Sequence, residues 1–460
     1  MLLSGVIEGF YGPPWTPAER IALFDRMASC GLNTYLYCPK DDLHHRAIWR
    51  EPYGPTDVET LAVLAAACRA RDIRFVYGLG PGLDIRYGDH AEQQRIHDRF
   101  TQMLGIGCDG VALLFDDIPD RLDPADVARW GSLAAAQAQV ANSLCAWVHT
   151  LHPHALVAFC PTPYCGRMAL AHHGGEGYLE ILGATLAPEI EVFWTGPEIV
   201  SREIPVAHVR DLAAILRRKP VIWDNLHAND YDSRRIACGP YAGRPLALRD
   251  EVRGLLSNPN TEFPLNEVPL RTLAAFVHTD GPWDPRRAYL QALQEWRPSF
   301  DTVHGPIALD DLVLLGDCFY LPYEEGPRAR RLYDQARGAL AAGSPSWRDD
   351  AAAFLADGGR LRDLCGRLST LRDRALFHAL HRRLWDLREE LDLLIRVVEA
   401  RLQTGDALPP FHSGAHLPGT CRGGMITRLQ QLLAQHPDGA FTSAHDRARQ
   451  DDDSWERRGG

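Results

Sequence analysis

The chain has 460 residues, 45% of them hydrophobic and 24% charged, and its formal net charge is −11. This composition is ordinary for a folded protein of two or three domains. The negative charge argues against a nucleic-acid binder and against docking on an anionic membrane, since both need a basic face. The chain also lacks an apolar run of the roughly 20 residues that a membrane span needs, and its first residues do not resemble a signal peptide.

The eleven cysteines are odd in number and scattered, and several fall inside apolar runs, as Cys38 and Cys160 do. This usage predicts buried free thiols in a reducing compartment, and therefore a cytoplasmic protein. Cys160 and Cys165 are separated by four residues, but no second pair or nearby histidine completes a zinc site. We therefore expect no metal and no other cofactor.

Short apolar runs alternate with longer amphipathic stretches over the first part of the chain. Eight such alternations favour a (β/α)8 TIM barrel over an open doubly wound sheet, so the fold class is α/β. No glycine-rich phosphate motif follows any run, which leaves nucleotide binding without support. The predicted strands are 4–8, 34–38, 74–78, 111–116, 156–160, 191–194, 221–223 and 262–265, and helical patterns between them include 17–30, 58–71, 91–104, 124–151 and 207–218.

Near residue 300 the strand-like runs stop and an all-α helical bundle domain is predicted. Leucines recur there at spacings of three and four, typical of a bundle or coiled-coil face: Leu361, Leu364, Leu368, Leu371, Leu380, Leu384, Leu387, Leu391 and Leu394. This stripe either packs within one chain or joins two copies, and we favour a homodimer. The predicted domains are a catalytic barrel at 1–300, a helical domain at 301–436 and a disordered tail at 437–460.

Two aspartates end the predicted fourth strand. The run before them, 111–115, is short and wholly apolar, as a buried parallel strand is, and Asp116 and Asp117 follow at its carboxyl end. Enzymes with parallel sheets keep their chemistry at this end of the strands. The alternative is that the pair caps a helix or lies on a solvated loop.

The segments after the other predicted strands are rich in Asp, Asn, Tyr and Trp and poor in basic residues. Such a lining suits a sugar, whose hydroxyls bind amides and carboxylates and whose ring faces stack on aromatics. A metal site formed by Asp116, Asp117, His227 and Asp230 stays open as a weaker alternative. The segments are 8–15, 39–42, 80–82, 161–166, 223–232 and 258–260, with Asn266 nearby.

Consecutive carboxylates fit a glycosidase mechanism in which the substrate supplies the nucleophile. The carbonyl of a 2-acetamido group attacks the anomeric carbon and forms an oxazoline. One carboxylate orients the acetamido group and must be ionised, while the other protonates the leaving oxygen and then activates water. The second group therefore needs a higher pKa than the first, and close coupling of two acids separates their values.

Four motifs in order closely resemble glycoside hydrolase family 84, which includes the O-GlcNAcases and bacterial β-N-acetylglucosaminidases. The resemblance covers essentially residues 1–300 and continues into the helical part. The motifs are 5–12 (GVIEGFYG), 37–42 (YCPKDD), 114–118 (LFDDI) and 221–225 (VIWDN) running through Asp232, followed by 317–323 (DCFYLPY).

The resemblance implies a retaining exo-β-N-acetylglucosaminidase that removes GlcNAc from Ser or Thr of glycoproteins through an oxazoline. It implies that Asp116 orients and polarises the acetamido group and that Asp117 is the general acid and base. Tyr164 would bind the oxazoline-forming oxygen, and Trp223 would wall the pocket for the acetyl methyl group. The remaining implied sugar-binding residues are Gly9, Lys40, Asn225, Asp230 and Asn258. The helical segment would be a stalk that pairs two subunits.

Two other functions stay open at this point. One is an endo-acting, hyaluronidase-like hydrolase of GlcNAc-containing glycans on the same scaffold. The other is a catalytically silent sugar-binding protein, against which the intact aspartate pair argues. The expected partner is in each case a protein or glycan that bears N-acetylglucosamine, with no nucleic acid and no membrane.

Overall fold

The computed structural model describes residues 2–341, 343–405, 411–412, 424–436 and 440–444. The chain divides into two compact units. The first holds residues 1–230 and 241–288, and the second holds 231–240 and 289–460. The first unit thus ends before the predicted boundary at residue 300, and the short segment 231–240, which was predicted to belong to the barrel, belongs to the second unit.

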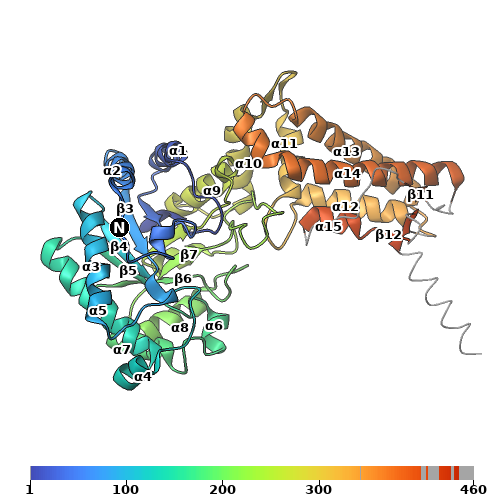
Figure 1. The fold of residues 1–460 in the computed structure, drawn as a ribbon. Coiled ribbons are helices and arrows are strands. Elements are labelled where there is room, and N and C mark those ends of the chain that lie inside the picture. The colour runs from blue at the N-terminus through green and yellow to red at the C-terminus, as the bar shows by residue number, and fades with distance from the viewer. Residues whose placement is uncertain (1, 342, 406–410, 413–423, 437–439, 445–460) are drawn as a thin grey trace, which may run out of the picture. The chain divides into compact units, whose positions relative to one another are not determined.

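Eight parallel strands close into a barrel at the centre of the first unit, which confirms the predicted fold (Figure 1). Each strand pairs with the next, and β1 pairs with β8 to close the ring. The strands are largely buried on both faces, because side chains fill the barrel inside and helices cover it outside. They are β1 (Leu3–Glu8), β2 (Thr34–Tyr37), β3 (Arg74–Leu79), β4 (Gly110–Leu114), β5 (Leu156–Cys160), β6 (Glu191–Trp194), β7 (Val221–Asp224) and β8 (Gly254–Ser257).

The prediction for the eighth strand was wrong. Residues 262–265 do not form a strand; instead Phe263–Asn266 form a short 3-10 helix, η4. Pro264 lies in its first turn and has no N–H to donate to a strand neighbour. The eighth strand is the earlier run Gly254–Ser257, whose opening glycine and closing serine make its apolar pattern short. As a consequence, Asn258 directly follows a strand end.

Helices surround the barrel, and several begin where their capping residues predict. Thr16 and Glu19 form a reciprocal capping box at the start of α1, which also has a proline in its first turn. The predicted helix 124–151 is in fact two helices, because Gly131 takes a left-handed conformation with φ of 74° and Ser132 caps a new start. These helices are α1 (Pro17–Ser29), α2 (Pro55–Arg69), α3 (His90–Gly105), α4 (Pro124–Trp130), α5 (Leu133–Leu151), α6 (Gly166–Leu170), α7 (Tyr178–Thr185), α8 (Val206–Leu216) and α9 (Glu267–His278). The next helix, α10 (Pro285–Trp296), belongs mostly to the second unit.

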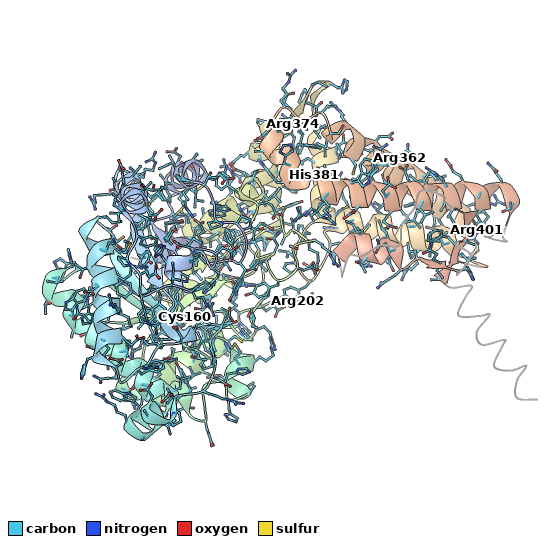
Figure 2. The ribbon with its side chains drawn as sticks, in the orientation of Figure 1. Cys160, Arg202, Arg362, Arg374, His381 and Arg401 are labelled. Atoms are coloured by element: carbon cyan, nitrogen blue, oxygen red, sulfur yellow. The ribbon has the colours of Figure 1, made fainter. Side chains whose placement is uncertain are left out.

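The second unit is helical, as expected, with α13 packed against both α12 and α14. A buried arginine ties two of these helices together: Arg401 of α14 donates to the carbonyls of Ala339 and Ala341 at the end of α12, where a helix favours positive charge. Figure 2 labels this residue. The helices are α11 (Leu309–Cys318), α12 (Pro327–Leu340), α13 (Trp347–Leu368), α14 (Arg374–Thr404) and α15 (Gly424–Gln430).

The leucine stripe packs inside the single chain. Every one of its nine leucines is at most 4% exposed without any partner copy. The argument that this face needs a second subunit was therefore wrong: neighbouring helices of the same bundle bury it. Periodicity indicates an apolar face but carries no information on which helix covers it.

Small sheets occur in the second unit, contrary to the expectation that strands stop near residue 300. β9 (Asp301–Thr302) pairs with β10 (Gly305–Pro306), and β13 (Ala440–Ser443) lies between β11 (Phe411–His412) and β12 (Leu433–Gln435). The strand β13 falls within the predicted disordered tail, where Ala440 and Phe441 are buried, so that part of the prediction was wrong. The rest of the tail lies outside the described residues.

Within the described part of the chain, no helix combines the length and apolarity that a membrane span requires. All ten cysteines there are free, and all but Cys30 are buried. Among them is Cys160, labelled in Figure 2, the last residue of β5, where burial raises the pKa of the thiol well above its ordinary value.

Candidate active site

Each of the nine predicted site residues lies at the carboxyl end of a barrel strand or just beyond it. This edge of a closed parallel barrel brings together residues that are far apart in sequence. Trp223 lies on β7 itself. The others follow strands: Gly9 follows β1, Lys40 follows β2, Asp116 and Asp117 follow β4, Tyr164 follows β5, Asn225 and Asp230 follow β7, and Asn258 follows β8.

Asp116 is buried and ion-paired. Its Oδ2 accepts a hydrogen bond from Lys40 Nζ at 2.5 Å, and both side chains are less than a tenth exposed. Burial works to raise the pKa of this carboxyl, but the charge and the hydrogen bond of Lys40 hold the pKa below its ordinary value. The other oxygen, Oδ1, is buried and makes no hydrogen bond to any described residue. Asp116 is thus an anion with one acceptor available for a ligand.

The pKa of Lys40 is shifted in the complementary direction. Burial lowers the pKa of its ammonium, but the Asp116 carboxylate outweighs this effect and raises the pKa above the ordinary value. Its Nζ also lies 5.8 Å from the centre of the Trp223 ring. The charged forms of these two buried side chains therefore stabilise one another.

Asp117 is in a different environment although it is the next residue. It is exposed, and its backbone is left-handed with φ of 51°, a conformation that is uncommon outside glycine, although Asp adopts it more readily than most residues. Two phenol groups donate to its carboxylate: Tyr164 to Oδ1 at 2.8 Å and Tyr11 to Oδ2 at 3.0 Å. The turn in the backbone lets two consecutive carboxylates occupy distinct surroundings.

Tyr11 and Arg46 also belong to this cluster, and sequence reasoning missed both. Arg46 donates from Nη1 to the Tyr11 hydroxyl at 3.0 Å and from Nη2 to the backbone carbonyl of Asp117. The Tyr11 amide donates to Asp230 at 3.0 Å. Their position after β1 and β2 was a usable signal, because every segment that follows a strand reaches the same edge.

Gly9 and Trp223 lie in close contact. A Cβ atom on Gly9 would fall 2.4 Å from the Trp223 ring, so only glycine fits at this position. The indole is 6% exposed and packs edge-to-face on Phe193. These contacts hold the Trp223 ring in place close to Lys40.

Asn225 and Asn258 join the ends of β7 and β8. The Asn258 side chain donates to Asn225 Oδ1 at 2.9 Å, and Asn225 donates to the Ile199 carbonyl at 2.8 Å. The Asn258 oxygen Oδ1 is buried and makes no hydrogen bond to any described residue. A buried acceptor of this kind at a strand end is suited to a ligand hydroxyl.

Other carboxylates at these strand ends serve the scaffold instead. Glu8 accepts two hydrogen bonds from Arg20 and one from the backbone of Trp15. Asp224 is buried against Arg244 at 2.6 Å and accepts from the Tyr241 hydroxyl. The oxygens of Glu8 and Asp224 are thus occupied by fixed partners, whereas Asp116 Oδ1 has no partner among the described residues.

His45 is buried beside the Lys40–Asp116 pair. Its Nδ1 bonds to the carbonyl of Gly78 at 2.9 Å, and burial together with the Lys40 charge lowers its pKa to about 4. The ring is therefore neutral at physiological pH. As for a metal, the described residues contain no group of three His, Cys, Asp or Glu side chains placed to hold an ion.

Comparisons with known proteins agree with this geometry. A family model described as beta-N-acetylglucosaminidase matches residues 4–309. The proteins named Protein O-GlcNAcase from Mus musculus and Rattus norvegicus are each 44% identical over 278 residues, which are 60% of this chain and 30% of theirs. The chain thus matches less than a third of the length of these relatives.

A solved structure resembles the fold of both parts of the chain. It is a variant of the O-GlcNAc hydrolase of Thermobaculum terrenum, with a TM-score of 0.77 and 27% sequence identity over 87% of this chain and 84% of that one. The strand-end cluster thus lies within the region that the family model matches, and the chain belongs to the beta-N-acetylglucosaminidase family of glycoside hydrolases.

Proposed function

We propose that this protein is a retaining exo-β-N-acetylglucosaminidase that releases GlcNAc from Ser or Thr of glycoproteins by substrate-assisted catalysis. The observation that carries the proposal is the unequal pair of adjacent carboxylates. Asp116 is buried and forms an ion pair with Lys40, whereas Asp117 is exposed and accepts hydrogen bonds from two tyrosine hydroxyls. The O-GlcNAcase names of the relatives support the substrate class.

In the first step, the ionised Asp116 accepts a hydrogen bond from the acetamido N–H of the substrate. This contact orients the carbonyl oxygen toward the anomeric carbon and stabilises the positive charge that develops on the acetamido group. A bond forms between that oxygen and the carbon while the bond to the leaving oxygen breaks. Asp117 gives its proton to the leaving oxygen.

Tyr164 has two partners in this scheme. In the free protein its hydroxyl donates to Asp117 Oδ1. A bound sugar brings the acetamido oxygen into competition for the same donor, and transfer of the hydrogen bond frees one oxygen of Asp117. In the second step, Asp117 takes a proton from a water molecule, and the water oxygen attacks the anomeric carbon from the face that the leaving group occupied. The bond between that carbon and the acetamido oxygen breaks, which opens the oxazoline. The product then retains its configuration.

The remaining residues bind the sugar. Asn225, Asp230 and Asn258 offer amide and carboxylate groups to hydroxyls, and Lys40 offers an ammonium in addition to its role beside Asp116. Trp223, held against Gly9, provides the apolar wall for the acetyl methyl group. No step in this scheme calls for a metal or cofactor, and prolonged chelation is expected to leave activity intact.

The mechanism can be tested with a series of aryl 2-acetamido-β-glucosides in which fluorine replaces hydrogen on the acetyl group. Fluorine withdraws electrons and weakens the carbonyl oxygen as a nucleophile, so kcat/KM should fall steeply with each substitution. The first-formed product should be the β-anomer. A flat dependence on fluorine, or an α-anomeric product, would contradict the proposal.

The exo-acting function is separated from the endo-acting alternative by product size. We expect free N-acetylglucosamine from aryl glycosides and from glycopeptides, and no shortening of a long glycan such as hyaluronan. A sugar-binding protein without turnover would bind N-acetylglucosamine yet release nothing from any of these substrates.

Two further parts of the proposal concern the whole protein. We retain the homodimer through the helical unit, now on the support of the α14 surface instead of the buried leucines. Trp385 on α14 is 60% exposed, which is unusual for so large an apolar side chain. Light scattering should report a dimer that Trp385→Ala weakens. We also propose a cytoplasmic location, in keeping with the free thiols.

A further inference from the structure

Arg46 is a buried cation whose hydrogen bonds reach the proposed general acid from two sides. The residue is 9% exposed, and it forms no ion pair with any carboxylate in the described part of the chain. It donates two hydrogen bonds, one to the Tyr11 hydroxyl and one to the backbone carbonyl of Asp117. The charge of Arg46 also helps to lower the pKa of Asp116, but a buried guanidinium that contacts no carboxylate is still costly, so its position requires an explanation.

The backbone of Asp117 supplies part of that explanation. Its φ of 51° lies in the left-handed region, which Asp tolerates better than most residues with a Cβ but which nearby contacts can still stabilise. Arg46 binds the carbonyl of this same residue. The contact therefore acts on the peptide that sets the direction of the Asp117 side chain.

The side chain of Asp117 is reached through a second route. Arg46 Nη1 donates to the Tyr11 hydroxyl at 3.0 Å, and that hydroxyl donates its own proton to Asp117 Oδ2 at 3.0 Å. The guanidinium directs the phenol because it can only donate, which leaves the phenol proton for the carboxylate. One cation thus orients both the backbone and one oxygen of Asp117.

We propose that Arg46 is a positioning residue for Asp117, which it aims at the leaving oxygen through the Asp117 carbonyl and through Tyr11. This proposal rests on the proposed function, in which Asp117 gives its proton to that oxygen as the glycosidic bond breaks. As the neutral Asp117 carboxyl gives up its proton in that step, it becomes a negatively charged carboxylate. A fixed cation and a phenol donor next to it stabilise the charge without further reorganisation.

The test uses the full chain and a series of aryl 2-acetamido-β-glucosides whose phenols range from acidic to weakly acidic. We expect Arg46→Met to lower kcat/KM by about 10- to 100-fold for the poorest leaving groups and by less than about threefold for the best. Arg46→Lys retains the charge but not the two-sided contact, so it should recover part of the loss. Tyr11→Phe should show the same dependence on the leaving group, more weakly.

Arg50→Met is the matched control. Arg50 belongs to the same loop after β2, but it pairs with Asp84 and Glu92 instead of Asp117. Its substitution should affect all leaving groups alike and only slightly. Should Arg46→Met fail to fold, as judged by circular dichroism, Tyr11→Phe and Arg46→Lys decide the question.

Asp117→Asn in the same series separates the failure of this proposal from that of the proposed function. If Asp117→Asn depends on the leaving group but Arg46→Met and Tyr11→Phe lower kcat/KM uniformly, Arg46 has no positioning role and the general acid stands. If Asp117→Asn itself gives a uniform loss, the assignment of the acid is wrong and the role of Arg46 falls with it.

Discussion

The two units of the chain differ in where their buried charges lie, although both bury apolar side chains and some charges, as the helical unit does with Arg401. The barrel buries charges at the carboxyl ends of its strands, and most of these have a fixed partner, as Glu8 has in Arg20. The helical unit buries leucines between α12, α13 and α14. Leucine packing is non-directional and stabilises whatever covers the face, whereas a buried carboxylate needs a partner of defined geometry.

This difference indicates which part of the fold carries the reactive groups. In the barrel, two buried acceptors at the strand ends, Asp116 Oδ1 and Asn258 Oδ1, make no hydrogen bond to any described residue and can therefore serve a ligand. In the helical unit, a long apolar stripe is explained by the bundle itself. The predictions below test this division between a reactive edge and a packing core.

The largest effect is expected from Asp117→Asn. An amide cannot donate the proton that a poor leaving group needs, so kcat/KM on aryl glycosides with weakly acidic phenols should fall by about 10²- to 10⁴-fold. Glycosides with good leaving groups need little protonation and should lose far less. Steady-state kinetics across leaving groups measures this. An equal loss throughout would remove Asp117 from the acid role.

Asp116→Asn should lower kcat/KM by about 10²- to 10³-fold, and the loss should persist with good leaving groups. The substitution removes the negative charge that stabilises the acetamido group during attack, a step that every substrate shares. The same kinetic series provides the measurement. Near-normal rates on good leaving groups would show that the role assigned to Asp116 is wrong.

Leu387→Ala should destabilise the helical unit by about 2–5 kcal/mol, because the leucine is fully buried in the bundle and its truncation leaves a cavity. Thermal unfolding measures the change, with Leu290→Ala, 37% exposed in the same unit, as a control expected within about 0.5 kcal/mol. Well below the unfolding midpoint, kcat/KM on a small aryl glycoside should stay near normal. A loss of kcat/KM that accompanies the loss of stability would show that catalysis in the barrel depends on packing in the helical unit.

Gly9→Ala should impair sugar binding by about 1–3 kcal/mol, because the added methyl group would meet the Trp223 ring and displace it. The measurement is the inhibition constant of N-acetylglucosamine together with KM. Gly281→Ala, where a Cβ meets nothing within 4 Å, is the control in the same unit. Unchanged binding in Gly9→Ala would mean that the indole is not part of the sugar pocket.

Lys40→Met should move the acid limb of the kcat/KM–pH profile to higher pH. Catalysis needs ionised Asp116, whose pKa is held below the ordinary value by Lys40 although burial works to raise it. Without the ammonium, burial dominates and the carboxyl stays protonated up to a higher pH. Lys219→Met, an exposed lysine of the barrel, should leave the limb in place. If the acid limb does not move in Lys40→Met, the limb does not report the ionisation of Asp116.

Local patterns were sufficient to predict much of this protein. Seven of the eight strands, the (β/α)8 barrel and the helical character of the second unit follow from the period of the apolar residues, which depends only on neighbours along the chain. The aspartate pair was visible for the same reason, because it ends a short apolar run. The eighth strand was missed because Gly254–Ser257 is too short for its pattern to stand out.

Tertiary structure alone decided how distant residues pair. Lys40 and Asp116 are 76 positions apart and Tyr11 and Asp117 are 106 apart, and only closure of the barrel brings each pair within hydrogen-bond distance. The unequal environments of two consecutive aspartates depend on these contacts and on the left-handed turn at Asp117. In the same way, the leucine stripe predicts an apolar face, but burial is non-directional, so only the packed bundle shows that the same chain covers it.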